Sequence, residues 1–190
     1  ADCEGSEDCV ETGDECGDGD DNDGDGLVDC VDPDCDGAPA CVAQLCVGAT
    51  VISGPGLFTG DSRDLEENFR GVCGGNGPEA LFTLTVNAAT TVCLDTDGSS
   101  YDTVLHVRSE CGDDGTEVGC DDDGGEGTRS ELELAALPGV DYTIFLDGFT
   151  FGGDYNLRVR YQACAAPIPD EVCDSGQDDD LDGSTDCADA

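Results

Sequence analysis

Hydrophobic and polar residues alternate in short stretches along the middle of the chain, between residues 46 and 164. Gly-rich turns separate these stretches, and the pattern is typical of strands with one buried and one solvated face. The clearest stretches are 81–86, 103–108, 131–134, 141–147 and 154–161. Many short strands spaced in this way predict an all-β fold, namely an antiparallel β-sandwich.

The alternation also predicts which side chains face the core. In 103–108, Leu105 and Val107 belong to the apolar set, so His106 is expected on the opposite, exposed face. The alternation continues furthest in 154–161. Its inward set is expected to be Tyr155, Leu157, Val159 and Tyr161, and its outward set Asn156, Arg158 and Arg160.

The two ends of the chain have a different character. Residues 1–45 and 165–190 are rich in Asp, Gly and Cys and have almost no apolar periodicity, so neither end can bury a hydrophobic core. We therefore expect three parts: an acidic, Cys-rich connector at 1–45, the sandwich at 46–164, and a second acidic connector at 165–190.

An acidic twelve-residue loop occurs once in each connector, at 21–32 and at 178–189. Both copies have Asp at loop positions 1, 3, 5, 9 and 12, Gly at 6 and Cys at 10. In calcium loops with this spacing, side chains from alternate positions and the carbonyl at position 7 converge on one cation. The predicted Ca²⁺ ligands are Asp21, Asp23, Asp25, Leu27, Asp29 and Asp32 in the first loop, and Asp178, Asp180, Asp182, Ser184, Asp186 and Asp189 in the second.

The two loops belong to a longer repeat. Cys16 precedes the first loop as Cys173 precedes the second, at an offset of 157 residues, and 2–10 aligns with 34–42 at an offset of 32. Together the offsets make 189 residues, so the second connector would continue into residue 2 of a next unit. We expect one repeat of a tandem array or a subunit of a head-to-tail polymer; the alternative is two related acidic modules cut at arbitrary points.

Fourteen cysteines in a chain with a net charge of −40 indicate an oxidising compartment, where disulfides support a modest core. Zinc clusters would need CxxC pairs or Cys with His, and the chain has no CxxC and one His. The cysteine spacings favour the pairs Cys3–Cys9, Cys16–Cys30, Cys35–Cys41, Cys46–Cys164, Cys73–Cys93, Cys111–Cys120 and Cys173–Cys187. The six cysteines of the sandwich region nevertheless allow fifteen pairings.

The charge restricts the partners of the chain. Two carboxylates about 5 Å apart repel by roughly 0.8 kcal/mol even in water, so the acidic segments should expand unless cations bind. Nucleic acids and anionic membranes need clustered Lys and Arg, and the chain has only six such residues. No stretch is long and apolar enough to predict a transmembrane helix.

The sequence does not predict an enzyme. His106 is the one imidazole, and its expected place on an exposed strand face gives it no partner for general base catalysis. Neither the GxSxG motif of serine hydrolases nor the HExxH motif of zinc proteases occurs. Calcium binding explains the paired carboxylates better than glycoside hydrolysis does.

The acidic loops resemble thrombospondin type 3 repeats and the calcium loops of bacterial surface proteins, whose pattern is DxDxDGxxDxxD. The resemblance implies a chain with little regular structure that wraps around calcium and is closed by disulfides. An EF-hand fits less well, because Pro33 directly follows the first loop and position 12 is Asp rather than Glu. No helix is therefore expected on either side of the loops.

The central region resembles the bacterial pre-peptidase C-terminal domain, a small jelly-roll-like sandwich of secreted proteins. The matching stretches are GPEALFTLTV, SYDTVLHVRSEC, VGCDDDGG and LPGVDYTIFLDGFTFGGDYNLRV, within residues 77–159. The resemblance implies an extracellular or cell-surface bacterial protein. It also implies that Asp102, Asp121, Asp122 and Asp123 hold a further calcium ion, although a solvated acidic turn is an equal alternative.

These observations favour a calcium-binding structural repeat of an extracellular bacterial filament, stalk or large adhesin, with further copies of itself as its partners. Calcium would convert a self-repelling chain into a rigid connector. The alternative is a sandwich that binds a surface polysaccharide or a protein, as a module of a secreted protein such as a protease. Such a site would need exposed aromatic side chains, for which Phe145, Phe149 and Phe151 are the candidates.

Overall fold

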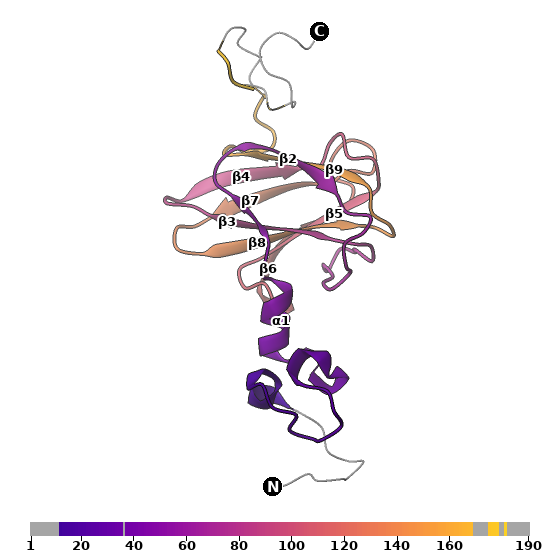
Figure 1. The fold of residues 1–190 in the computed structure, drawn as a ribbon. Coiled ribbons are helices and arrows are strands. Elements are labelled where there is room, and N and C mark those ends of the chain that lie inside the picture. Colours follow the sequence, from indigo (N-terminus) through magenta and orange to yellow (C-terminus); the bar gives the residue numbers. More distant parts are fainter. Residues whose placement is uncertain (1–11, 36, 169–174, 179–180, 182–190) are drawn as a thin grey trace. The chain divides into compact units, whose positions relative to one another are not determined.

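The computed structural model describes residues 12–35, 37–168, 175–178 and 181 (Figure 1). The chain divides into two compact units, Ala1–Gly48 and Ala49–Ala190. Among the described residues, no helix has the length and apolar character that crossing a membrane requires.

The first unit consists of short helical segments around disulfides. Its elements are the 3-10 helices η1 (Gly13–Gly17), η2 (Asp29–Val31) and η3 (Pro33–Cys35) and the α-helix α1 (Pro39–Leu45). The side chains buried at its centre are those of Cys16, Cys35 and Cys41. Disulfides thus take the place of an apolar core in this unit, which agrees with its lack of apolar periodicity.

The expectation that no helix flanks the first calcium loop is wrong, because α1 follows it closely. Pro39 stands in the first turn of α1, where a missing N–H costs nothing. Cys41 bonds the helix to Cys30 in the loop. This bond supplies the support that so short a helix lacks on its own.

The disulfides of the first unit differ from the predicted pairs Cys16–Cys30 and Cys35–Cys41, which are wrong. The structure pairs Cys16 with Cys35 and Cys30 with Cys41. The first bond joins the chain before the calcium loop to the chain after it, and the second joins the loop to α1. The prediction instead closed each cysteine-containing stretch on itself. The predicted pairs Cys3–Cys9 and Cys173–Cys187 lie outside the described residues.

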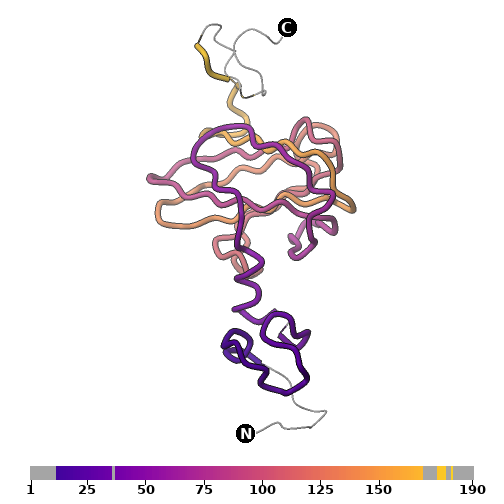
Figure 2. The backbone as a smooth tube through the Cα atoms, in the orientation of Figure 1, coloured from indigo at the N-terminus to yellow at the C-terminus, as the bar shows by residue number. Residues whose placement is uncertain are grey.

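The second unit is an antiparallel β-sandwich, as predicted (Figures 1 and 2). Its elements are β1 (Thr50–Ile52), β2 (Gly56–Asp61), β3 (Ala80–Thr85), β4 (Thr90–Asp95), β5 (Thr103–Arg108), η4 (Asp114–Thr116), β6 (Glu117–Asp121), β7 (Glu131–Ala136), β8 (Asp141–Gly148) and β9 (Asp154–Arg160). One sheet has the strand order β1-β3-β8-β5-β6 and the other β2-β9-β4-β7. Only the short strand β1 runs parallel to its neighbour, β3.

The core of the sandwich lies between the two sheets. Alternate residues such as Leu105 and Leu146 from one sheet meet Leu94, Leu134 and Leu157 from the other, and all five are buried. Strands β3, β5, β7, β8 and β9 coincide closely with the predicted stretches. Strands β1, β2, β4 and β6 had no such signal, because they are short or interrupted by Gly, Cys and Asp.

The outer face of β5 and β8 is covered as well, so the prediction that His106 is exposed is wrong. The segment 62–79 between β2 and β3 lies over this face and places Phe69 against Phe145, with ring centroids 5.0 Å apart. His106 stacks on Phe145 with a centroid distance of 4.3 Å and is 0% exposed. Every residue of β5 is consequently buried, although its sequence alternates.

Strand β9 follows its predicted orientation except near its end. Leu157 and Val159 face the core, with Tyr155 packed against it. Arg160 points outward as predicted, but it is buried because the chain that follows the strand lies over it. Its Nη2 lies 3.1 Å from Asp95 Oδ2. Tyr161, predicted to face inward, is 37% exposed, since β9 ends one residue before it.

The predicted disulfides of the sandwich, Cys73–Cys93, Cys111–Cys120 and Cys46–Cys164, are also wrong. Cys73 pairs with Cys120, and Cys93 pairs with Cys164. Cys120 lies opposite His106 on the outer face, so it meets the covering segment that carries Cys73. Cys93 lies in the other sheet opposite Arg160, within reach of the chain that returns after β9.

Candidate metal centres

The backbone of the first acidic loop is shaped by its own carboxylates. Asp21 accepts the N–H groups of Gly24 and Gly26 at 2.7 and 3.0 Å. Both glycines have left-handed φ angles, 83° and 98°, which residues with a side chain adopt only at a cost. Asp23 and Asp25 each accept the N–H two residues on, at 3.0 and 2.7 Å. The loop is therefore a series of tight turns that brings alternate carboxylates to one side.

Asp21, Asp23 and Asp25 converge as the sequence predicts, with one carboxylate oxygen from each lying within 4.8 Å of the others. Oxygens on opposite sides of a calcium ion are separated by about 5 Å, twice the Ca²⁺–O distance. The three carboxylate oxygens are thus spaced closely enough to contact one calcium ion together.

Asp32, at loop position 12, has a buried carboxylate oxygen without a hydrogen-bond donor in the described part of the chain, which the loop spacing alone does not predict. Its side chain is buried, 3% exposed, and Oδ1 accepts the N–H of Asp34 at 2.8 Å. Its other oxygen, Oδ2, has no hydrogen-bond partner among the described residues. A buried carboxylate oxygen without a donor is costly unless a cation binds it.

The charges around Asp23 support the same conclusion. The N–H of Asp25 lowers the pKa of Asp23, but desolvation and repulsion from Asp25, Asp32 and Asp21 together raise that pKa above its ordinary value. Repulsion between carboxylates that the fold holds together is what a divalent cation relieves.

The other two predicted ligands of the first loop, Asp29 and Leu27, take part in hydrogen bonds within the segment. Asp29 has a left-handed φ of 50°, and its Oδ1 accepts the N–H of Gly19 at 3.2 Å. Leu27 donates its N–H to Asp25, and a ligand role for its carbonyl stays a prediction.

The second loop is described only at Asp178 and Leu181; its predicted ligands Asp180, Asp182, Ser184, Asp186 and Asp189 lie outside the described residues. Leu181, at loop position 4, has a left-handed φ of 58°, as Gly24 has at the same position of the first loop. Gly176 and its counterpart Gly19 also share a left-handed φ, 72° and 86°. The sequence repeat is therefore also a repeat of backbone conformation where both copies can be compared.

A second acidic group lies at one end of the sandwich. Asp102 precedes β5 and Asp122 and Asp123 follow β6, and since these strands are antiparallel neighbours, the three side chains meet. One oxygen from each lies within 4.8 Å of the others. Asp121, predicted as a fourth ligand, instead accepts the N–H groups of Gly124 and Glu131 through Oδ2, at 2.9 and 2.8 Å.

This group, too, contains carboxylate oxygens without partners. Asp102 Oδ1 and Asp122 Oδ1 are buried and have no hydrogen-bond donor in the described part of the chain. Burial, followed by repulsion from Asp123, raises the pKa of Asp102 and of Asp122. A hard cation would satisfy both oxygens, so the group stays a predicted metal site, with a solvated acidic turn as the alternative.

A third cluster of possible metal-binding side chains comprises Cys93, Cys164 and Glu131. The two cysteines form a disulfide and offer no thiolate, and Glu131 lies 3.7 Å from Arg160. This cluster is therefore a structural contact and not a metal site.

Sequence reasoning missed a group of buried ionisable residues beneath segment 62–79. His106 Nε2 lies 2.8 Å from Asp147 Oδ2, and both residues are 0% exposed. Glu79 accepts the N–H groups of Asn68 and Phe69 and contacts Asp147. With no solvent-facing surface, His106 cannot meet a substrate. Its neighbours could not be found from the sequence, because Glu79 and Asp147 are distant in the chain and neither stands in a motif.

Burial sets the protonation of this group. It raises the pKa of Glu79 and of Asp147. Repulsion from Asp147 adds to the rise at Glu79, whereas the hydrogen bond with Glu79 partly lowers the pKa of Asp147. Burial also lowers the pKa of His106 to about 4. Asp147 Oδ1 has no donor among the described residues unless one carboxyl of the pair is protonated. A proton held between Glu79 and Asp147 would satisfy that oxygen.

No protein-family model matches the chain, and neither does any curated protein. Solved structures similar to it include the pre-peptidase C-terminal domain of a collagenase from Bacillus anthracis, with 15% identity and a TM-score of 0.43, over 59% of this chain and 94% of that one. Another is PliG, a periplasmic inhibitor of g-type lysozyme from Aeromonas hydrophila, with 16% identity and a TM-score of 0.41, over 60% of this chain and 96% of that one. At these identities and TM-scores, neither says what this chain binds.

Proposed function

We propose that the chain is a calcium-binding structural module of an extracellular or cell-surface protein, and that copies of it are arranged head to tail in a filament, stalk or large adhesin. The observation that carries the proposal is the convergence of Asp21, Asp23 and Asp25, together with a buried, unpartnered oxygen of Asp32, whose charge helps to raise the pKa of Asp23. The disulfides of both units support an oxidising compartment.

The proposed role of calcium is mechanical. Asp21, Asp23 and Asp25 repel one another while they are ionised, and they stay together when they share a divalent cation. The loop that carries them is bonded through Cys30 to α1, so fixing the loop also fixes the helix that follows it. In the sandwich, Asp102, Asp122 and Asp123 would join the start of β5 to the end of β6 in the same way.

Calcium titration of single-residue variants tests the first centre. Asp23→Asn removes one converging carboxylate, and we expect it to weaken calcium binding at this loop by about tenfold or more, because a neutral amide replaces a charged ligand. Isothermal titration calorimetry of the oxidised chain measures the change.

Asp20→Asn is the matched control for that titration, since it makes the same change of charge next to the loop but outside the converging group. It should bind calcium nearly as the unchanged chain does. If both variants weakened calcium binding equally, the acidic segments would attract calcium only through their overall negative charge. The proposed site at this loop would then be wrong.

The head-to-tail arrangement rests on the repeat offsets of 157 and 32 residues, which align the second connector with the first. We expect two copies joined at that 189-residue spacing to form a rod of defined length in calcium and a looser, more expanded and more variable particle in chelator, because the unneutralised carboxylates repel one another. Small-angle X-ray scattering of the two-copy chain distinguishes these outcomes. Identical profiles in calcium and chelator would contradict calcium-stiffened connectors.

The alternative function, a sandwich that binds a surface polymer, is favoured by one specific observation. Phe149 and Phe151 are 40% and 63% exposed beside the β8–β9 turn, as such a binding module would require. Phe145, the third predicted aromatic, is buried beneath Phe69 and His106 and is unavailable for binding.

A further inference from the structure

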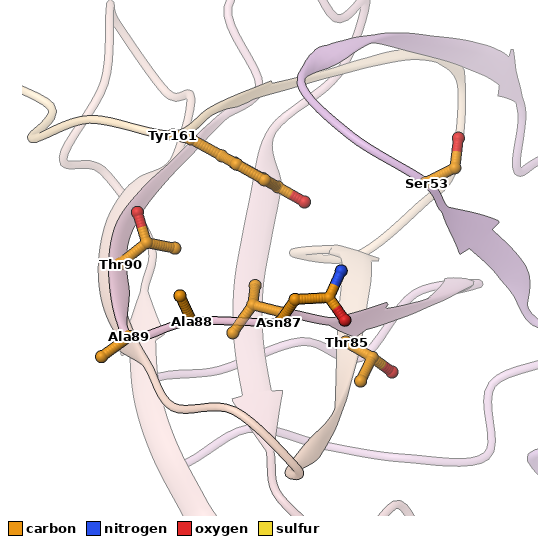
Figure 3. Close-up of a pocket in the computed structure, with 8 residues that line it drawn as sticks. Ser53, Thr85, Asn87, Ala88, Ala89, Thr90 and Tyr161 are labelled. Carbon is orange, nitrogen blue, oxygen red and sulfur yellow. The ribbon is translucent and has the colours of Figure 1, made fainter.

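The second unit has a surface pocket of about 380 Å³ (Figure 3). It lies at the end of the sandwich opposite Asp102, because Thr85 pairs with the start of β8 and Thr103 with its end. The walls of the pocket come from three places: Ser53 after β1, the β3–β4 turn at 85–90, and Tyr161 after β9. The volume is at the lower end of the range for small-molecule sites, which is about 300–1,000 Å³.

The pocket walls carry no charge. No Asp, Glu or Arg lines the pocket, although charged residues make up 27% of the chain and nearly all of them are acidic. Just outside it, Thr85 Oγ1 donates to Asp141 Oδ1 at 2.6 Å, which places a carboxylate beside the rim. An anionic ligand would meet that carboxylate and the negative field of the whole chain, so the pocket favours an uncharged one.

The polar groups of the pocket are available to a ligand. The side chains of Ser53, Asn87 and Tyr161 form no hydrogen bond within the described part of the chain. They offer a hydroxyl, an amide and a phenol, each of which can both donate and accept. A ligand with several hydroxyl groups would match this set.

Tyr161 supplies the apolar surface that such a ligand also needs. Tyr161 is 37% exposed, and its side chain extends into the pocket with the hydroxyl end toward Asn87 and Ser53 (Figure 3). Beneath it, Ala88 and Ala89 present only methyl groups, which leave the ring face open to approach. A pyranose ring has the required combination, an apolar C–H face and a rim of hydroxyls.

We propose that this pocket binds one sugar residue of a neutral glycan, with the Tyr161 ring as the stacking platform and Asn87 and Ser53 as hydrogen-bonding partners. The pocket shares no residue with either of the proposed calcium centres. Because the pocket opens to the surface, it could take an internal residue of a polysaccharide as well as a terminal one.

Nuclear magnetic resonance titration of the full oxidised chain in calcium tests the proposal. The probes are neutral hexasaccharides of N-acetylglucosamine, β-linked glucose and α-linked glucose, with a hexamer of galacturonic acid as the anionic comparison. We expect at least one neutral probe to give saturable amide shifts confined to 53, 85–90 and 161, and the anionic probe to give none. Absence of such shifts with all three neutral probes would overturn the proposal.

Variants identify the groups that bind. Tyr161→Ala should weaken binding by about tenfold or more, and Asn87→Ala by a smaller factor, whereas Tyr161→Phe should retain most of the affinity because it keeps the ring. Phe151→Ala is the matched control, since it removes an aromatic ring that is 63% exposed outside the pocket. If Phe151→Ala abolished binding and Tyr161→Ala did not, the glycan site would lie at the β8–β9 turn and this assignment would be wrong.

Discussion

Chelation of calcium should lower the thermal stability of the oxidised chain at neutral pH, with residues 21–32 losing protection first. A site kept at a hundred times its dissociation constant stabilises the native state by about 2.7 kcal/mol. Chelator removes this contribution and leaves Asp21, Asp23 and Asp25 repelling one another in a unit whose hydrophobic cluster consists of buried cysteines. Calorimetry and amide hydrogen exchange, each with and without EGTA, measure the two effects.

Two double variants show which of the two proposed calcium centres accounts for the loss of stability in EGTA. Combined Asp23→Asn and Asp25→Asn should make residues 21–32 insensitive to EGTA and leave the response at the start of β5 intact. Combined Asp102→Asn and Asp122→Asn should do the reverse, because these residues hold the centre in the sandwich. Unchanged melting and unchanged exchange in excess EGTA would remove calcium from the structural role proposed for this chain.

The sequence predicts the sandwich well because its core obeys a two-residue period. Alternate residues of a strand face the opposite sheet, as Leu105 and Val107 do in β5 and Leu157 and Val159 do in β9. The same rule fails on the outer face of β5, since alternation does not reveal that segment 62–79 crosses over it. His106 is buried for that reason, and no local pattern distinguishes it from a solvated strand residue.

The calcium ligands and the disulfides differ in how local their determinants are. Asp21, Asp23 and Asp25 converge within one loop, so their spacing alone predicts their geometry. Asp121 lies outside the converging group of the sandwich, and its Oδ2 accepts backbone N–H groups from the turn and from β7. Cysteine pairing depends on which segments cross in space, which is why Cys120 meets Cys73 rather than the nearer Cys111.

Asp147→Asn should make the sandwich more stable than the unchanged chain at pH 9, by about 1 kcal/mol or more, and the advantage should shrink at pH 5. Burial raises the pKa of Asp147 and of Glu79, so the native state holds protons that the unfolded chain releases above its ordinary carboxyl pKa of about 4. This contribution to stability is complete below that pKa and is lost as the pH rises through the raised native values. An amide at position 147 cannot ionise, and it can still hydrogen-bond to His106.

Comparison with the unchanged chain isolates the effect of the Glu79–Asp147 pair on the pH dependence of stability. His106 contributes a pH dependence of the opposite sign, but it does so in both proteins. Its lowered pKa, about 4, makes its contribution complete above about pH 6.5 and reduces it as the pH falls. Thermal melting from pH 5 to pH 9 in constant calcium measures the difference, and 1 kcal/mol corresponds to about 2–4 °C. Asp141→Asn, on the same strand but exposed, should leave the pH slope unchanged. The opposite result would be an Asp147→Asn variant that is less stable than the unchanged chain by the same amount at pH 5 and at pH 9. Asp147 would then have to be ionised beside His106, and no proton would be shared with Glu79.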